Sequence, residues 1–408
     1  MERTVCELFA GVGGFRCGLN GVKTLEDMEK PERWETVWFS QWEPAEKNTQ
    51  YAHDCYVYHF GTCLDKNGAD TTNYNIEEVD KRTLPDFNLL VGGFPCQDYS
   101  VASSLATSKG LEGKKGILWW SIRETIEEKQ PPFVLLENVD RLLKSPARQR
   151  GRDFGVMLAC FRDEGYTVEW RVINAAEYGF QQRRRRVFIF AYKDDTRYNG
   201  DIQAKNGYAL KASVEEKRTC MSQVLLKDGF FASTFPVMDV DPKELLIEEL
   251  PEGLGALSDS FAFGFENTGI MKDGVVYTCK TVPAYEGGQI TLGDIMETGD
   301  VEERYFIPEK KLYYTDPDVH HSDETEKRLP KEDRQTWDKK TGRIRLLTAG
   351  ETERIQGFPT DHTKYCLVEG EAVEMPLHKR RFMMGNALVV DLVRLMGRTL
   401  EGIFEREP

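Results

Sequence analysis

Short apolar runs alternate with an amphipathic stretch in the first part of the chain. Residues 87–91 (Phe-Asn-Leu-Leu-Val) and 131–136 (Pro-Pro-Phe-Val-Leu-Leu) are typical of buried parallel strands, and residues 117–126 between them carry apolar side chains at helical spacing. This order predicts a strand–helix–strand crossover, so the carboxyl ends of both strands should lie at one edge of a sheet. Further strands are predicted at residues 4–9, 36–40 and 187–191. The pattern therefore predicts an α/β protein with a doubly wound sheet.

Reactive side chains stand beside three of these strands. Gly93-Phe94-Pro95-Cys96-Gln97 follows the strand at 87–91, Glu137 follows the strand at 131–136, and four arginines, residues 183–186, precede the strand at 187–191. Singly, such a cysteine is more often a small buried hydrophobe, and a charged run is usually a solvated face. At one sheet edge, however, Cys96 becomes a candidate nucleophile and Glu137 a candidate general acid. The arginines supply rigid donors for a phosphate or a base carbonyl.

A glycine-rich turn follows the first predicted strand. Residues 7–14 (Glu-Leu-Phe-Ala-Gly-Val-Gly-Gly) would let the backbone approach a cofactor closely, although a lone turn of this kind is as often only a tight turn. Its adjacent glycines differ from the dinucleotide fingerprint Gly-x-Gly-x-x-Gly. Glu43, after the second strand, could accept from both hydroxyls of a ribose, and Pro44 could pack against an adenine.

Composition limits the class of protein. The 408 residues can hold one large and one smaller domain, and neither a signal segment nor an apolar run long enough to span a bilayer is recognisable. Nine cysteines without a Cys-x-x-Cys pair, and six histidines without a ligand cluster, argue against a disulfide framework and a metal site. We therefore expect a cytoplasmic protein with no membrane association and no bound metal.

The net charge of −14 is unusual for a protein that binds nucleic acid. Basic residues are nevertheless concentrated in three segments, residues 141–152, 183–186 and 379–381. Because phosphate affinity depends on the local field of a cleft more than on the total charge, these segments are the candidate phosphate contacts.

These features, in this order, resemble the DNA cytosine-5 methyltransferases of bacterial and phage type. The segments that carry the resemblance are Glu7–Gly14 (first motif), Trp42–Pro44 (second), Gly93–Gln97 (fourth), Glu137–Val139 (sixth), Gln182-x-Arg184-x-Arg186 (eighth), Arg345–Glu351 with Gln356–Pro359 (ninth) and Gly385–Ala387 (tenth). The match covers residues 1–191 and about 343–408. Glu7 replaces the usual Asp, so the hydrogen bonding of the turn should be rearranged, and Asn75 stands where an Asp usually accepts from the adenine amine.

The resemblance implies S-adenosylmethionine as the methyl donor and a covalent mechanism. It assigns Cys96 as the nucleophile, Glu137 as the donor to the cytosine ring, Arg186 as the ligand of the O2 carbonyl and Arg184 as a supporting residue. The implied cofactor contacts are Phe9, Gly11, Val12, Gly14, Glu43, Pro44, Asn75, Ile76, Pro95, Leu118, Asn386 and Ala387. The target cytosine would have to be flipped out of the duplex.

The resemblance also predicts the domain organisation and partners. Residues 1–195 with 366–408 should form the catalytic domain, and residues 196–365, which carry few family motifs, a target-recognition domain. The expected partner is double-stranded DNA, bound by a monomer in the cytoplasm of a bacterium or phage-infected host, alongside a companion restriction endonuclease.

Three alternatives remain open at this stage. A tRNA cytosine-5 methyltransferase could use the same scaffold, but the roughly 150 residues after Ala191 favour DNA. A nicotinamide oxidoreductase would leave Cys96, Glu137 and Arg186 without a role. A cofactor-binding regulator without activity would not need a complete catalytic set.

Overall fold

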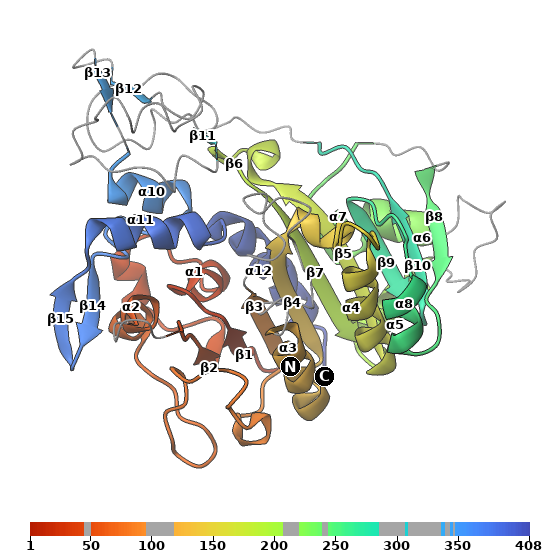
Figure 1. Ribbon diagram of the computed structural model, residues 1–408, viewed down its shortest axis with the longest axis horizontal. Helices are drawn as coiled ribbons and strands as arrows, with labels where there is room; N and C mark the ends of the chain where they lie inside the picture. The colour runs from red at the N-terminus through yellow and green to blue at the C-terminus, as the bar shows by residue number, and fades with distance from the viewer. Residues whose placement is uncertain are drawn as a thin grey trace.

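The computed structural model describes residues 1–44, 50–94, 118–206, 220–238, 244–284 and 347–408, together with the backbone of three short strands at 307–308, 336–338 and 343–345 (Figure 1). Two of the predicted site residues, Pro95 and Cys96, lie outside the described residues.

A nine-stranded sheet forms the centre of the protein (Figure 1). Its strands in sheet order are β2 (Glu35–Ser40), β1 (Thr4–Leu8), β3 (Leu89–Gly93), β4 (Phe133–Val139), β7 (Arg185–Lys193), β5 (Tyr166–Asn174), β9 (Thr268–Lys272), β10 (Val275–Cys279) and β8 (Leu246–Glu249). The first four run parallel to one another, and from β4 onwards every neighbouring pair is antiparallel. The α/β class is therefore confirmed, with a sheet that is parallel on one side and antiparallel on the other.

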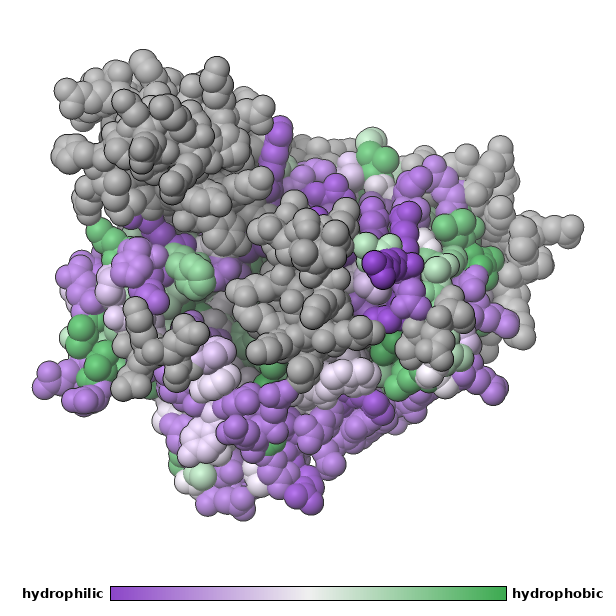
Figure 2. Space-filling model, in the orientation of Figure 1, coloured by the Kyte–Doolittle hydropathy of each residue, from purple (hydrophilic) through white to green (hydrophobic). Residues whose placement is uncertain are grey.

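Alternate strand residues face opposite sides of the sheet, and each side carries its own core. Leu89 and Val91 belong to one buried cluster, and Leu90 between them belongs to the other. Helices whose side chains join the first cluster are α1 (Gly14–Leu19), α2 (Tyr51–Phe60), α5 (Arg197–Asn206), α6 (Cys220–Gln223), α7 (Phe230–Thr234), α11 (Leu377–Asn386) and α12 (Val390–Phe404). Those that join the second are α3 (Leu118–Lys129), α4 (Arg152–Asp163) and α8 (Leu254–Ser260). On the face shown in Figure 2, hydrophilic side chains dominate the described surface, as expected when the apolar ones fill two cores.

The remaining elements connect or flank this sheet. They are a π-helical turn (Val224–Asp228), α10 (Ala349–Ile355), four 3₁₀ turns (Leu25–Glu29, Lys81–Thr83, Asp140–Lys144 and Ala175–Tyr178), and three pairs of short strands. The pairs are β6 (Gln182–Arg183) with β11 (Ile307–Pro308), β12 (Thr336–Asp338) with β13 (Arg343–Arg345), and β14 (Tyr365–Val368) with β15 (Glu371–Glu374).

The two ends of the chain pack against each other. Helix α12 lies so close to α1 that a Cβ added to Gly18 would lie 2.6 Å from the side chain of Val393, closer than real side chains approach. The N-terminal amine donates to the carbonyl of Glu407 at 3.1 Å. The C-terminal segment thus completes the layer that covers the first strand–helix unit.

Three strands from within the predicted second domain extend the central sheet. β9 pairs with β5, and Gly269 of β9 makes room for Trp170, since a Cβ at Gly269 would lie 2.0 Å from the indole ring. β10 and β8 continue the sheet outwards. The domain boundaries at residues 196 and 365 remain a prediction, but residues 246–279 are built onto the large sheet.

Candidate active site

Glu137 and Arg186 meet at the carboxyl edge of β4. Because β7 runs antiparallel to β4, the beginning of β7 lies beside the end of β4, and Arg186 is in register with Val139. Glu137 Oε1 and Arg186 Nε are 2.9 Å apart, and the two side chains are only 12% and 9% exposed. A pair this well shielded from water orients both groups firmly.

The end of β3 lies directly against this pair. Gly93 is in register with Glu137, and a Cβ added to Gly93 would lie 3.4 Å from Glu137 Oε2. The amide of Asn138 donates to the carbonyl of Phe94 at 3.3 Å. The described part of this segment therefore ends beside the Glu137 carboxyl group, two residues before Cys96 in the sequence.

Arg184 connects the arginine segment to the C-terminal part of the chain. Its buried guanidinium donates to the carbonyl of Gly385 at 3.0 Å. Gly385 directly precedes the predicted cofactor contacts Asn386 and Ala387, which end α11. This hydrogen bond thus links the arginine segment to the residue that precedes Asn386 and Ala387.

The glycine turn between β1 and α1 has a backbone that few residue types can adopt. Phe9, Gly11 and Gly13 all have positive φ, and Gly13 at +86° faces the ring of Phe60, which a Cβ would approach to 2.7 Å. Gly14 packs against Leu388, just after the tenth motif, where a Cβ would lie 3.1 Å away. The turn is therefore shaped by close packing from α2 and from the C-terminal segment.

The end of β2 lies against the same turn. Ser40 accepts from the amide of Ala10, and Gln41 Oε1 accepts from the amide of Gly11 at 2.7 Å. Glu43 is half-buried. Its backbone N–H donates to the side-chain oxygen of Gln50, and its carbonyl accepts from the side-chain nitrogen of Gln50. No described residue forms a hydrogen bond with the Glu43 carboxylate. Desolvation raises the pKa of Glu43, while nearby Lys379 lowers it. Sequence reasoning selected Glu43 and missed Gln41, whose position directly after the strand was the available signal.

The surroundings of Glu7 show how the turn accommodates a side chain that is one methylene longer than the usual Asp. Its buried carboxyl accepts from the hydroxyl of Tyr56 at 3.0 Å and faces the amides of Phe15 and Arg16 in α1. Burial raises the pKa of Glu7 to about 7, against the lowering effect of these donors. The hydrogen bond of the Glu7 carboxyl therefore links the turn to α2, which contributes Tyr56.

The remaining predicted contacts have local roles in the structure. Asn75 accepts from the amide of Glu77 at 3.3 Å, and the buried Ile76 accepts from Lys81 Nζ at 2.6 Å through its carbonyl. Leu118 is the first residue of α3 and packs against the second core. Pro44 is exposed, and Val12 is buried with its carbonyl bonded to His362 Nε2 at 2.7 Å.

Comparison with known proteins places these features in a family. The sequence pattern of C-5 cytosine-specific DNA methylase matches residues 3–402. The type II methyltransferase M.Sau3AI of Staphylococcus aureus is 40% identical over 432 aligned positions, which cover 98% of this chain and 95% of that protein. The chain belongs to the C-5 cytosine-specific DNA methylase family.

Other relatives of this C-5 DNA methylase match over a smaller region. The type II methyltransferase M.NgoBI of Neisseria gonorrhoeae is 32% identical over 195 residues, 48% of this chain and 52% of that protein. Among solved structures, the methyltransferase EhMeth of Entamoeba histolytica covers 99% of this chain and 98% of its own at 14% identity and a TM-score of 0.46, which is too distant to bear on function.

The family assignment confirms the predicted enzyme class, a DNA cytosine-5 methyltransferase, and makes the tRNA alternative the less supported one. It does not test individual residues, so the roles of the predicted site residues stay predictions. Within the described part of the chain, no helix combines the length and hydrophobicity needed to cross a membrane.

Proposed function

We propose that this C-5 DNA methylase transfers a methyl group from S-adenosylmethionine to carbon 5 of a cytosine flipped out of a specific duplex sequence, through a covalent adduct with Cys96. The observation that carries the proposal is the shielded Glu137–Arg186 pair, 2.9 Å apart, at the edge where β3 leads towards Cys96. An acid and a guanidinium held together in this way suit a ring nitrogen and its neighbouring carbonyl.

The pair would make carbon 5 of cytosine reactive. The Cys96 thiolate adds to carbon 6, the electrons of the 5,6 double bond move into the ring, and Glu137 delivers a proton to N3. Arg186 holds the O2 oxygen. After carbon 5 has accepted the methyl group, a base removes its remaining proton, the carbon–sulfur bond breaks to release the thiolate, and N3 returns its proton to Glu137. Arg184 would support this arrangement through Gly385.

The glycine turn fits S-adenosylmethionine, which supplies an activated methyl group when bound. The proposed contacts in this turn are Phe9, Gly11, Val12 and Gly14. Gly11 leaves the backbone open to close approach, because a Cβ there would meet nothing within 4 Å. Glu43 offers a half-buried carboxylate for the ribose hydroxyls. We extend the set by Gln41, whose side chain already reaches the turn. The further predicted contacts are Pro44, Asn75, Ile76, Pro95, Leu118, Asn386 and Ala387.

DNA would dock on the basic segment that follows Glu137. Lys144, Arg148 and Arg150 are exposed on the short stretch between β4 and α4. The hydroxyl of Ser145 donates to Asp153 of α4 at 2.6 Å. This hydrogen bond fixes the backbone that carries the three basic side chains. Three exposed cations on this stretch could offset the overall negative charge locally where phosphates would lie.

Recognition of the target DNA sequence would reside in residues 196–365. Exchanging this segment for that of a relative with a different target should transfer the methylated sequence, and an active chimera that keeps the original target would place recognition elsewhere. Because M.Sau3AI is a type II methyltransferase, we also propose that this enzyme acts as a cytoplasmic monomer that protects host DNA from a companion endonuclease.

The direct test compares substrates. The purified protein and labelled S-adenosylmethionine are incubated with a duplex that contains many sequences, and in parallel with unmodified tRNA, and the product nucleosides are identified by mass spectrometry. We expect 5-methylcytosine in the duplex only. Labelled tRNA with unlabelled duplex would contradict the proposal.

A further inference from the structure

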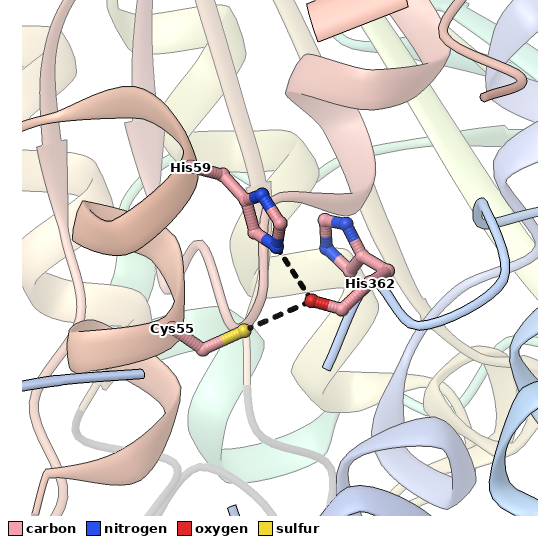
Figure 3. A group of neighbouring side chains, drawn as sticks. All are labelled: Cys55, His59 and His362. Carbon is pink, nitrogen blue, oxygen red and sulfur yellow. Dashed lines mark hydrogen bonds between the residues drawn. The ribbon is translucent and has the colours of Figure 1, made fainter. Parts of the chain in front are cut away.

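Two side chains of α2 and one from the C-terminal segment bring three metal-binding atoms together (Figure 3). Cys55 and His59 are four residues apart on one face of α2, and His362 lies between α10 and β14. One ligand atom of each lies within 4.8 Å of the other two. In a tetrahedral zinc site the ligand atoms are roughly 3.3–3.8 Å apart. The distances between the three atoms must therefore shorten by about 1 Å for a metal to bind.

His362 is already in the form that a metal ligand requires. Its Nε2 faces the carbonyl of Val12 at 2.7 Å, and since a carbonyl only accepts, Nε2 carries the proton. Its Nδ1 is therefore an unprotonated nitrogen, and it is buried without a hydrogen-bond partner. A buried acceptor left unpaired destabilises the folded protein, and a ligating histidine commonly donates its other ring N–H to a backbone carbonyl.

The other two side chains are tied to a single oxygen. His59 Nε2 donates to the backbone carbonyl of His362 at 2.5 Å, and the Cys55 thiol points to the same oxygen at 3.6 Å (Figure 3). The rings of His59 and His362 are stacked, 4.5 Å apart and 5° from parallel. Because a metal lies in the plane of each imidazole that binds it, the half-buried His59 must rotate out of this stack to ligate.

We propose that Cys55, His59 and His362 form a site for a borderline divalent cation such as Zn²⁺, with the fourth position taken by water. Sulfur and imidazole nitrogen are the donors that Zn²⁺ prefers. Loading exchanges the thiol proton of Cys55 for the metal and releases that proton to solvent, and it moves the His59 ring proton to Nδ1. The sequence prediction of no metal rested on the absence of Cys-x-x-Cys and of a histidine cluster along the chain. The Cys-x-x-x-His spacing in α2 was the signal it passed over.

The bound ion would tie the glycine turn to the C-terminal segment, because His362 also holds Val12. This role is independent of methyl transfer. It predicts that the ion stabilises the folded protein, since a ligand that binds only the folded state raises its apparent stability.

The test uses Co²⁺ as a spectroscopic stand-in on the full chain, freed of metal with a chelator. We expect one Co²⁺ per chain, a sulfur-to-cobalt charge-transfer band in the near ultraviolet, and the strong visible bands of a four-coordinate ion that Zn²⁺ then abolishes. Cys55→Ser should lose the charge-transfer band, and His59→Gln should weaken binding at least tenfold. His53→Gln, on the same helix but outside the cluster, and Cys96→Ser should keep the spectrum of the wild type.

Thermal unfolding supplies a second readout. Zn²⁺ should raise the melting temperature of the wild type and leave that of His59→Gln, a half-buried position, unchanged. A wild type without the charge-transfer band, or a band that survives in Cys55→Ser, would overturn the proposal. A band that disappears in Cys96→Ser would place the ion at the predicted nucleophile instead.

Discussion

The glycine turn between β1 and α1 is the proposed cofactor turn, and the Glu137–Arg186 pair at the end of β4 is the proposed catalytic edge. Both lie at the same end of the sheet, but they are held by different means. The turn is shaped by contacts with glycine positions, where Phe60 lies against Gly13 and Leu388 against Gly14. The catalytic edge depends on charge, with one guanidinium and one carboxyl 2.9 Å apart. The turn should therefore lose stability when a side chain is added at a glycine. The catalytic edge should lose activity when a charge is removed, although the fold remains intact.

The largest effect should come from the catalytic edge. Glu137→Gln keeps the size of the side chain but removes the proton donor, so we expect the single-turnover rate to fall by about 10²–10⁴-fold. Asp140→Asn is the matched control, because Asp140 pairs with the exposed Arg185 at the same edge, at 3.3 Å. Exposed pairs contribute about 0–1 kcal/mol, so this variant should keep its rate nearly unchanged. Equal losses of rate in Glu137→Gln and Asp140→Asn would mean that the carboxyl group of Glu137 has no special role in the reaction.

The cofactor turn should respond to added volume. Gly13→Ala combines a φ of +86° with a Cβ that would lie 2.7 Å from the Phe60 ring. We expect it to lower the free energy of unfolding by about 2–5 kcal/mol, measured by urea denaturation. Gly21→Ala, at +71° with nothing within 4 Å, isolates the backbone strain and should lose about 1–2 kcal/mol. A loss in Gly13→Ala no larger than in Gly21→Ala would mean that close packing does not shape the turn.

The charge of Glu43 should affect the binding of S-adenosylmethionine. Glu43→Ala is expected to weaken S-adenosylmethionine binding by about 1.5–3 kcal/mol, the range of hydrogen bonds to a charged group. Gln41→Ala removes a neutral hydrogen bond to Gly11 and should weaken binding by about 0.5–1.5 kcal/mol. Calorimetry with folded variants measures both. The reverse order would make Gln41 the principal ribose ligand.

The smallest effect concerns the DNA contacts beside the catalytic edge. Replacing Lys144, Arg148 or Arg150 singly with Gln should reduce the slope of log affinity against log salt by about 0.9 each, because each phosphate contact releases counterions. Arg3→Gln is the control, since Arg3 lies before β1 and pairs with Glu405. Methylation at low salt should persist in all four variants. Unchanged slopes would remove the basic segment from the DNA interface without affecting the proposed chemistry.

Sequence alone placed β1, β2, β3, β4 and β7 and the residues at their ends, because buried strands and glycine turns leave strong local patterns. It did not predict β5, which lies between β7 and β9 in the central sheet. It did not show that β7 runs antiparallel to β4, and this direction is what brings Arg186 to Glu137. Residues 246–249 and 268–279 also joined the central sheet unexpectedly, because strand pairing between distant segments leaves no local pattern. The Cys55, His59 and His362 group was missed although Cys55 and His59 are close in the sequence, because its third member is 303 residues from His59.

The central claim is that Cys96, which follows Phe94 by two residues in the sequence, is the covalent nucleophile that acts with the Glu137–Arg186 pair. A duplex in which 5-fluorocytosine replaces the target base blocks removal of the group at carbon 5, so incubation with S-adenosylmethionine should trap a complex that survives denaturation. Peptide mapping should locate the attachment at Cys96, one of nine cysteines, and Cys96→Ser should form no such complex. A complex that still forms in Cys96→Ser, or that maps to another cysteine, would contradict the account.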